Sequence, residues 1–153
     1  MRVTVLALSL LLLAPASASA IIQVDKGMAG ARIDNTKAEV RAALGNPRRV
    51  MQGMNDFGEF TEYRYRGQIR VIFQGRKRVS SVSTTGLGDR TRRGVGVGST
   101  EARVRSRVAG ITCESFGSFR TCHTGDFSAG SRVTDFQIED GRVSRVVVGI
   151  VID

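Results

Sequence analysis

Residues that could take part in chemistry are concentrated in two short stretches of this 153-residue chain. The first is RRGVGVGSTE, from Arg92 to Glu101, which places alternating glycines and two arginines directly before a helix-like run. A glycine-rich turn that leads into a helix can hold a phosphate, because its backbone amides and the helix dipole both favour an anion. On that interpretation the protein would bind a nucleotide.

The second stretch is TCESFGSFRTC, which contains both cysteines of the chain, Cys113 and Cys122. An even number of closely spaced cysteines in an oxidising compartment is typical of a disulfide. Closing this loop would remove about 2.7 kcal/mol of unfolded-state entropy. The alternative is a metal or redox pair with His123 as a third ligand. A metal site prefers CxxC-type spacing and a tetrahedral ligand set, and the chain has a single histidine, so the disulfide is favoured.

The remaining residues offer little for catalysis. One histidine cannot be combined with a nucleophile that has a recognisable local signature. Paired carboxylates are the only other option, and those near the C-terminus are Asp135, Glu139, Asp140 and Asp153. At strand ends and turns such groups are usually solvated, and a glycosidase needs a larger cleft than a domain of this size provides. The sequence therefore predicts no enzyme, no cofactor and no bound metal.

A repeat with an offset of 64 positions offers another explanation of the glycine run. GARIDNTKAEVRAAL, residues 30–44, falls on GVGVGSTEARVRSRV, residues 94–108. The same offset aligns RVS at 78–80 with RVS at 142–144. Two similar segments are expected to adopt the same local structure.

The first copy does not keep the glycines of the second. Arg32 and Asp34 stand where the second copy has Gly96 and Gly98, and an aspartate at that place would repel a phosphate. The two copies share residues that start a helix instead. The glycine run is therefore expected to shape the start of a helix and to hold no anion.

The pattern predicts, in each copy, a short helix followed by antiparallel strands. Thr36 and Thr100 are N-cap candidates, and Glu39 completes a capping box with Thr36. Apolar residues then recur at helical spacing until a glycine stops the helix. Alternating patterns predict strands at 60–66, 69–73, 78–84, 120–123, 133–138 and 142–152. The last strand is nearly all apolar from residue 146, which indicates burial on both faces or pairing beside the other copy's sheet.

The N-terminus has the order of a secretory signal peptide: Arg2, an apolar run at 3–13, and then APASASA. We expect cleavage after Ala20, and the apolar run is too short for a membrane span. No cysteine lies near the cleavage site, so a lipid anchor is not expected. The protein is thus expected to be secreted or to lie in the cell envelope, with a first unit at 21–86 and a second at 87–153.

The second copy, VGVGSTEARVRSRVAGITCESFGSFRTCHTGDF, resembles a repeat of the secreted β-lactamase inhibitory proteins. The first copy, with TKAEVRAALGNP, is similar to the small lipoprotein of the outer-membrane barrel-assembly machine (SmpA/OmlA type). The resemblance implies an α+β fold of two tandem helix-plus-antiparallel-sheet repeats packed side by side. It also implies a protein that binds another protein.

The resemblance and the aromatic residues together suggest where a partner would bind. The inhibitors carry an aspartate in a Gly-Asp-aromatic hairpin, which Gly125-Asp126-Phe127 matches, although here it lies in the second repeat. Phe116 and Phe119 are the best candidates for exposed contacts, because both belong to the disulfide loop. The leading hypothesis is a non-enzymatic, inhibitor-like module that binds an extracellular or envelope protein through the sheet face and this loop.

Charge supports an alternative partner. The net charge of +9 favours acidic surfaces, so the protein could bind acidic cell-wall or extracellular polymers. The basic residues proposed for this role are Arg76, Lys77, Arg78, Arg92 and Arg93. A further alternative is an accessory protein of envelope assembly. Nucleic acid is not expected as a specific partner.

Overall fold

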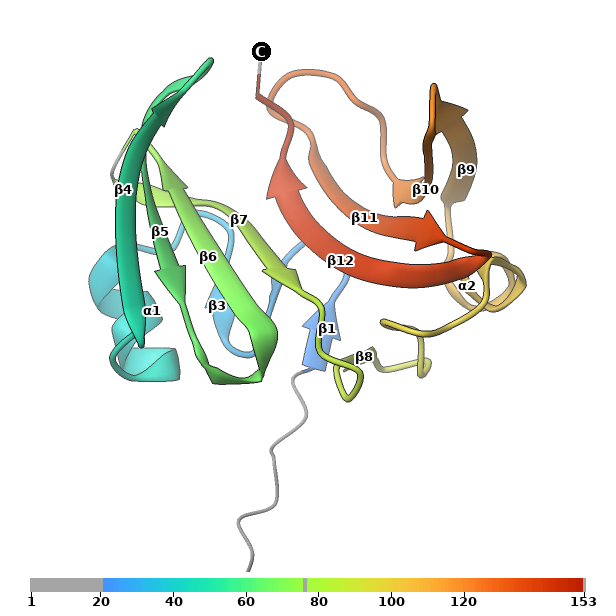
Figure 1. Ribbon diagram of the computed structural model, residues 1–153, viewed down its shortest axis with the longest axis horizontal. Helices are drawn as coiled ribbons and strands as arrows, with labels where there is room; N and C mark the ends of the chain where they lie inside the picture. Colours follow the sequence, from blue (N-terminus) through green and yellow to red (C-terminus); the bar gives the residue numbers. More distant parts are fainter. Residues whose placement is uncertain (1–20, 76, 153) are drawn as a thin grey trace, which may run out of the picture.

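The computed structural model describes residues 21–75 and 77–152. The expected signal peptide at 1–20, Arg76 and Asp153 therefore lie outside the described residues. The long strands and two short α-helices are shown in Figure 1. In chain order the elements are β1 (Ile21–Gln23), β2 (Gly27–Met28), β3 (Ala31–Arg32), α1 (Lys37–Leu44), β4 (Arg49–Asn55), β5 (Gly58–Arg64), the 3-10 turn η1 (Arg66–Gln68), β6 (Ile69–Gln74), β7 (Arg78–Thr84), β8 (Arg90–Thr91), α2 (Glu101–Arg107), β9 (Ile111–Phe116), β10 (Phe119–Thr124), β11 (Arg132–Glu139) and β12 (Arg142–Ile150).

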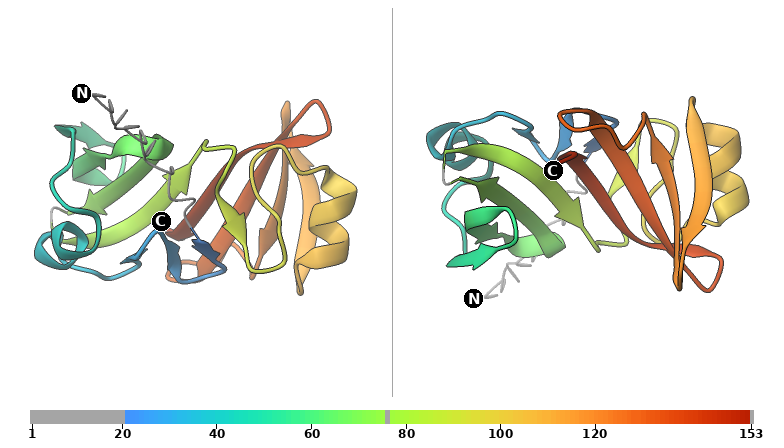
Figure 2. Two further views of the ribbon diagram at one scale, coloured as in Figure 1. Left: turned by 90° about the horizontal axis from the view of Figure 1, so that it is seen from below. Right: turned by 90° about the horizontal axis from the view of Figure 1, so that it is seen from above.

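Eight strands form one antiparallel sheet in the order β4-β5-β6-β7-β12-β11-β10-β9. At its centre β7 pairs with β12, so that Val82 lies opposite Val148. Two alternatives were expected for the apolar terminal strand. This pairing confirms the second, that the strand pairs beside the sheet of the first copy. Figure 2 shows the strands from both parts of the chain lying side by side as one layer.

A second, smaller sheet has the order β3-β2-β1-β8. β1 pairs antiparallel with β2 and parallel with β8, which places Ile22 opposite Thr91. Ile22, Met28 and Ala31 from this sheet are buried in the hydrophobic core. The small sheet thus closes the core on one side of the large sheet.

The two faces of the large sheet differ because successive side chains of a strand point to opposite sides. One face carries the fully buried residues Val71, Phe73, Val82, Phe136 and Val146. We call this the core face. The other, which we call the open face, carries the alternate residues of each strand. They include Met51, Gly53, Phe60, Glu62, Arg64, Arg70, Ile72, Ser81, Ser83, Arg145, Val147, Asp135, Gln137, Phe119, Thr121, His123, Glu114 and Phe116.

Both helices cover the core face. In α1, the Lys37 ammonium lies 5.6 Å from the centroid of the Phe73 ring, and Val40 is fully buried. In α2, Glu101 pairs with Arg120, whose side chain is on the same side of β10 as the buried Cys122. The open face has no helix against it in the described part of the chain.

The expected fold class, α+β with two tandem helix-plus-antiparallel-sheet repeats packed side by side, is wrong. The described residues are mostly β, arranged in two sheets, with α-helices of only 8 and 7 residues. The reason is that β7 and β12 hydrogen-bond to each other, so both parts of the chain complete a single large sheet. The small sheet likewise draws strands from residues 21–32 and 90–91. The division of the chain at residue 86 stays a prediction.

The predicted starts of both helices are confirmed. The Thr36 hydroxyl accepts from the Glu39 amide at 3.3 Å, and the Glu39 carboxylate accepts from the Thr36 amide at 2.7 Å, which completes the capping box. Thr100 caps α2 by accepting from the Arg103 amide at 3.2 Å. α1 ends at Gly45, as expected from the sequence.

The 64-residue offset corresponds to one shared local structure. Arg78 donates to the carbonyl oxygen of Asp34 at 2.8 Å, and Arg142 donates to that of Gly98 at 3.0 Å. Asp34 and Gly98 both adopt a left-handed backbone, with φ of 69° and 86°. Glycine and aspartate are among the residues that tolerate this conformation. The sequence similarity thus marks a common helix start and not two separate helix-plus-sheet units.

Neither α-helix in the described ranges has the length and apolar character needed to cross a bilayer.

Candidate functional site

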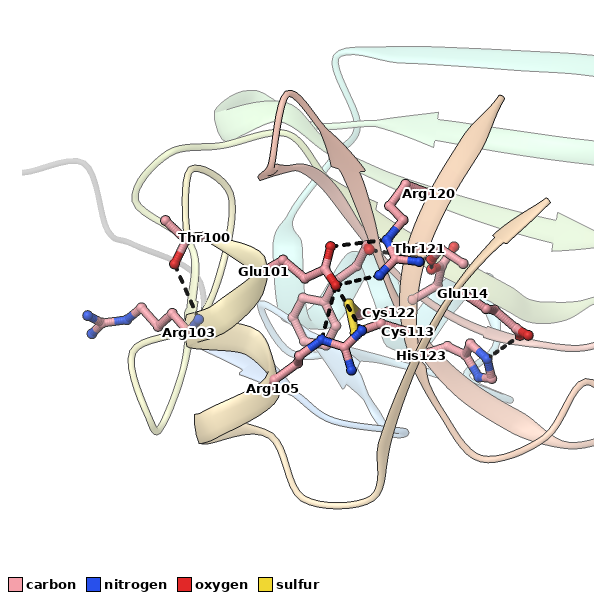
Figure 3. Close-up of a disulfide and its surroundings, with 12 residues drawn as sticks. Thr100, Glu101, Arg103, Arg105, Cys113, Glu114, Arg120, Thr121, Cys122 and His123 are labelled. Carbon is pink, nitrogen blue, oxygen red and sulfur yellow. Dashed lines mark hydrogen bonds and ion pairs between the residues drawn. A yellow bond between two sulfur atoms is a disulfide. The ribbon is translucent and has the colours of Figure 1, made fainter. Parts of the chain in front are cut away.

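The disulfide hairpin of β9 and β10 is the centre of the candidate site (Figure 3). Cys113 and Cys122 lie directly opposite each other in the register and form a disulfide, with their Cα atoms 3.9 Å apart. This confirms the predicted pairing. Glu101 lies close to both sulfur atoms, but a metal could not use them as thiolates because they are joined to each other.

His123 does not act with the cysteines. It follows Cys122 on β10, so its ring lies on the open face while the disulfide lies on the core face. Its Nε2 is 2.7 Å from Glu114 Oε1, and its Nδ1 is buried without a hydrogen-bond partner in the described structure. The proposed metal or redox site with His123 is therefore not assembled by these residues.

Three phenylalanines form an exposed cluster on the open face beside the hairpin. Phe116 and Phe119 lie opposite each other across the turn and are 52% and 76% exposed. Phe127, from the loop after β10, is 45% exposed, and its ring centroid is 6.0 Å from that of Phe116 in an edge-on contact. Phe127 also packs against His123 at 4.2 Å. We call Phe116, Phe119 and Phe127 the aromatic cluster.

The hairpin is held in place from the other side by charged residues of α2. Glu101 accepts from Arg120 on β10 at 2.6 Å and from Arg105 at 2.9 Å (Figure 3). The hydrogen bond from Arg120 holds the pKa of the Glu101 carboxyl below its usual value. These contacts fix the position of the hairpin relative to the helix, so that the aromatic cluster is presented on a stable support.

Asp126 has a local role in the loop that carries Phe127. Its carboxylate accepts from the Ser131 hydroxyl at 2.7 Å and from the Ser128 amide at 3.4 Å. The Ser131 hydrogen bond lowers the pKa of Asp126. The residue is exposed, so it shapes the turn and also presents charge at the edge of the aromatic cluster.

Asp135 departs from the expectation for the C-terminal carboxylates, which was that they are solvated. It lies on the open face, where the Thr121 hydroxyl donates to its carboxylate. Burial raises its pKa above the usual range for aspartate. The sequence gives no signal of this burial, because the neighbours of Asp135 come from other strands.

The glycine run is structural. The amides of its glycines all donate to groups of the protein itself, and Thr100 caps α2, so these amides are not directed at a ligand. The bonds are Gly94 to the Thr91 carbonyl at 2.9 Å, Gly96 to the Ser99 hydroxyl at 3.1 Å, and Gly98 to the Val143 carbonyl at 2.7 Å. This arrangement agrees with the expectation that the run shapes the start of a helix.

The structure separates the predicted basic residues. Lys77 and Arg78 are at the β6–β7 turn, where Arg78 donates to the Asp34 carbonyl. Arg92 and Arg93 line a pocket between the small sheet and the end of α2. Three further cations line that pocket and were not predicted, namely Lys26, Arg32 and Arg107. They come from distant parts of the chain, so only the pairing of β1 with β8 reveals that they are neighbours.

Comparisons with known proteins give no family for the chain. No protein-family model matches it, and no curated protein matches it. Among solved structures it is similar to an extracellular protein containing an SCP domain from Bacillus anthracis, with a TM-score of 0.49 and 11% identity over 77% of this chain and 44% of that one. A cysteine-rich secretory protein from Staphylococcus aureus matches with a TM-score of 0.49 and 10% identity, over the same shares of the two chains. A DUF4309 family protein from Bacillus subtilis matches with a TM-score of 0.46 and 21% identity over 76% of this chain and 78% of that one. The chain thus spans less than half the length of the first two.

The resemblance to the β-lactamase inhibitory proteins and the barrel-assembly lipoprotein inferred from the sequence was wrong, because both parts of the chain join in one large sheet and do not form two helix-plus-sheet repeats. The sequence similarity that suggested it lies in the helix starts and the cysteine loop, which are local features. The disulfide fits a location outside the cytoplasm, where such bonds persist.

Proposed function

We propose that this protein is a secreted, non-enzymatic module that binds another protein through the aromatic cluster and the adjoining open face. The observation that supports this most is the exposure of three phenylalanines on one disulfide-linked hairpin and its following loop. Clustered aromatic side chains at the surface are enriched in protein interfaces, because they bury much apolar area at a small cost in conformational entropy.

The cluster is pre-organised for binding. The disulfide lies three residues from Phe116 and Phe119 on their respective strands, and Phe127 is held between Phe116 and His123. A partner would therefore lose little binding free energy to ordering Phe116 and Phe127. The partner's own surface should carry an apolar recess to receive the rings.

The partner should also be acidic. The chain has a formal net charge of +9. On the open face beyond the cluster, Arg64 and Arg70 share the carboxylate of Glu62, and Arg145 adds a further positive charge. Charges around an apolar centre mainly determine the association rate and the choice of partner. The expected partner is an extracellular or envelope protein with an apolar recess and a net negative charge.

A non-enzymatic role is supported by the state of the single histidine. Its Nε2 contacts Glu114 and its side chain is only 5% exposed, so it is poorly placed to reach a substrate. The most prominent chemistry-bearing residues of the sequence are thus used inside the fold: the cysteines are oxidised and the glycines shape a helix start.

The test is capture of a crosslinked partner from secreted and envelope fractions, followed by measurement of its dissociation constant. We expect binding to persist at about 0.5 M salt, where exposed charges are strongly screened. The double variant F116A/F119A should weaken binding at least about tenfold, which corresponds to roughly 1.4 kcal/mol.

Phe57 provides the matched control. It is 51% exposed at the β4–β5 turn, on the opposite edge of the sheet, so F57A removes a comparable ring from a different place. F57A should retain wild-type affinity. The proposal would be refuted by a partner that binds F116A/F119A as tightly as wild type, or by equal losses in F57A.

A further inference from the structure

A basic pocket lies between the small sheet and the end of α2, and it has a volume of about 580 Å³. Ile22, Val24 and Val108 are among its apolar lining residues. Its cations are Lys26, Arg32, Arg92, Arg93 and Arg107, and no carboxylate of the described residues lines it. We propose that this pocket, called the basic pocket below, binds a linear polyanion through its phosphate groups.

The fold brings these cations together from four parts of the chain. β8 pairs in parallel with β1, so the turn that follows Thr91 lies next to the end of β1. That turn is closed by a hydrogen bond from the Thr91 amide to the Val95 carbonyl at 2.7 Å, and Arg92 and Arg93 lie within it. Arg107 is added by the last turn of α2. Five like charges at one place repel each other, and such an arrangement is typical of a site that binds an anion.

The acids next to Lys26 and Arg32 in the sequence are directed elsewhere. Asp25 precedes Lys26, but its carboxylate accepts from the Thr134 hydroxyl at 2.9 Å and from the Thr124 hydroxyl. Asp34 follows closely after Arg32, but it pairs with Arg132 at 2.5 Å. The cations of the basic pocket form no ion pair with a carboxylate within residues 21–75 and 77–152. Their charge is therefore not neutralised by the fold.

The lining continues along α2, which favours an extended ligand. A second hollow of about 780 Å³ shares Arg107 with the basic pocket and adds Arg90, Arg103 and Arg142, again without a carboxylate. Gly94 and Gly98 of the glycine run also line this hollow, but their amides donate within the fold, so the arginine side chains would hold a ligand there. Arginines outnumber lysines in both hollows. The planar guanidinium group of arginine can donate two parallel hydrogen bonds to two oxygens of one phosphate. A chain of phosphates can occupy both hollows, whereas a single phosphate can occupy only one.

This binding would not use the surface of the proposed function. The small sheet and α2 cover the core face, whereas the aromatic cluster lies on the open face. The two proposals can therefore fail separately.

In the experiment, the protein without its expected signal peptide (residues 21–153) is titrated by calorimetry. Inorganic polyphosphate and inorganic phosphate are used as ligands in separate titrations. Polyphosphate should bind at least about tenfold more tightly than phosphate, because it can contact several cations at once. The slope of log K against log salt should be at least about 3.5 in magnitude and negative, because the five cations of the basic pocket contribute about 0.7 each on a flexible chain. Polyglutamate of equal charge should bind more weakly than polyphosphate.

Two variants that lose the same amount of charge test whether polyphosphate binds at the basic pocket. R92Q/R93Q/R107Q should weaken polyphosphate binding about thirtyfold or more and reduce the salt slope by about 2. R48Q/R49Q/R66Q removes three exposed arginines outside the basic pocket and should change the affinity less than about threefold. Equal losses in the two variants would overturn the proposal, as would polyglutamate binding as tight as polyphosphate, or the absence of polyphosphate binding to wild type.

Discussion

Gly96 offers the sharpest test of whether the glycine run is structural. A Cβ atom at this position would lie 2.0 Å from the carbonyl oxygen of Asp89 and 2.8 Å from Nη1 of Arg90. The carbonyl belongs to the backbone, so no side-chain rotation can relieve the contact. G96A should therefore force the turn between β8 and α2 apart.

The magnitude follows from this single contact. The φ angle of Gly96 is not in the left-handed region, so alanine would not be strained by the backbone conformation itself. The cost comes from overpacking, which usually amounts to 1–3 kcal/mol, and a backbone approach this close belongs at the upper end. We expect a loss of about 3 kcal/mol in the free energy of unfolding, or a fall in Tm of about 10 °C.

The assay is thermal and urea denaturation of G96A beside G117A. Gly117 is a suitable control because its φ is 59° and no atom lies within 4 Å of its built Cβ, so only the backbone strain of about 1 kcal/mol applies. Polyphosphate affinity should be measured on both variants below their melting temperatures. If G96A melts like wild type but no longer binds polyphosphate, the glycine run is an anion cradle and the structural interpretation is refuted.

Three further perturbations test the hairpin and its supports. Replacing both Cys113 and Cys122 by serine should lower the free energy of unfolding by about 2.7 kcal/mol, measured by urea denaturation, and an unchanged midpoint would contradict the contribution of the disulfide. E101Q should destabilise the protein at neutral pH, because the lowered pKa of Glu101 means that its stabilisation is present above the unfolded value and is lost as pH falls through the folded value. Denaturation midpoints of E101Q and wild type should therefore converge in acid. D135N should do the opposite: the raised pKa means that ionised Asp135 opposes folding, so the variant should be more stable than wild type at pH 7, with the difference vanishing below about pH 4.

The central elements of the fold could be predicted because their patterns are strong. β6 and β7 alternate buried and less buried residues along most of their length, and β12 carries the apolar run that indicated burial on both faces or pairing beside the other copy's sheet. The N-cap threonines allowed the starts of both helices to be predicted, because their hydrogen bonds involve only residues within one turn. Such local signals depend little on the rest of the structure.

The edge strands were missed because they have only one neighbour in the sheet. In β4 every residue except Met51 is exposed, so its sequence shows no alternation that could indicate a strand. β9 is also an edge strand, and its register became clear only from its pairing with β10. The strands of the small sheet have 2 or 3 residues, too few to form any period.

The way in which the two similar segments pack together could not be predicted from the sequence, for a different reason. Similarity at a fixed offset shows that two segments share a local structure, but it does not show whether they pack as separate units or join their edges. The joining depends on the central strands β7 and β12, whose backbone groups pair with each other. The same long-range pairing hides the basic pocket, because Lys26 and Arg107 are distant in sequence.

Strand β10 explains how one small protein can carry two independent surfaces. Its alternate residues Arg120, Cys122 and Thr124 face the core side, where Arg120 holds α2 through Glu101 and Thr124 holds the Asp25 carboxylate. Phe119 and His123 point the other way and belong to the open face. The contacts that support the basic pocket are therefore separated by the sheet from those that support the aromatic cluster. Since the sheet prevents direct competition, saturating polyphosphate should leave the affinity of a protein partner at the aromatic cluster unchanged apart from the neutralised charge.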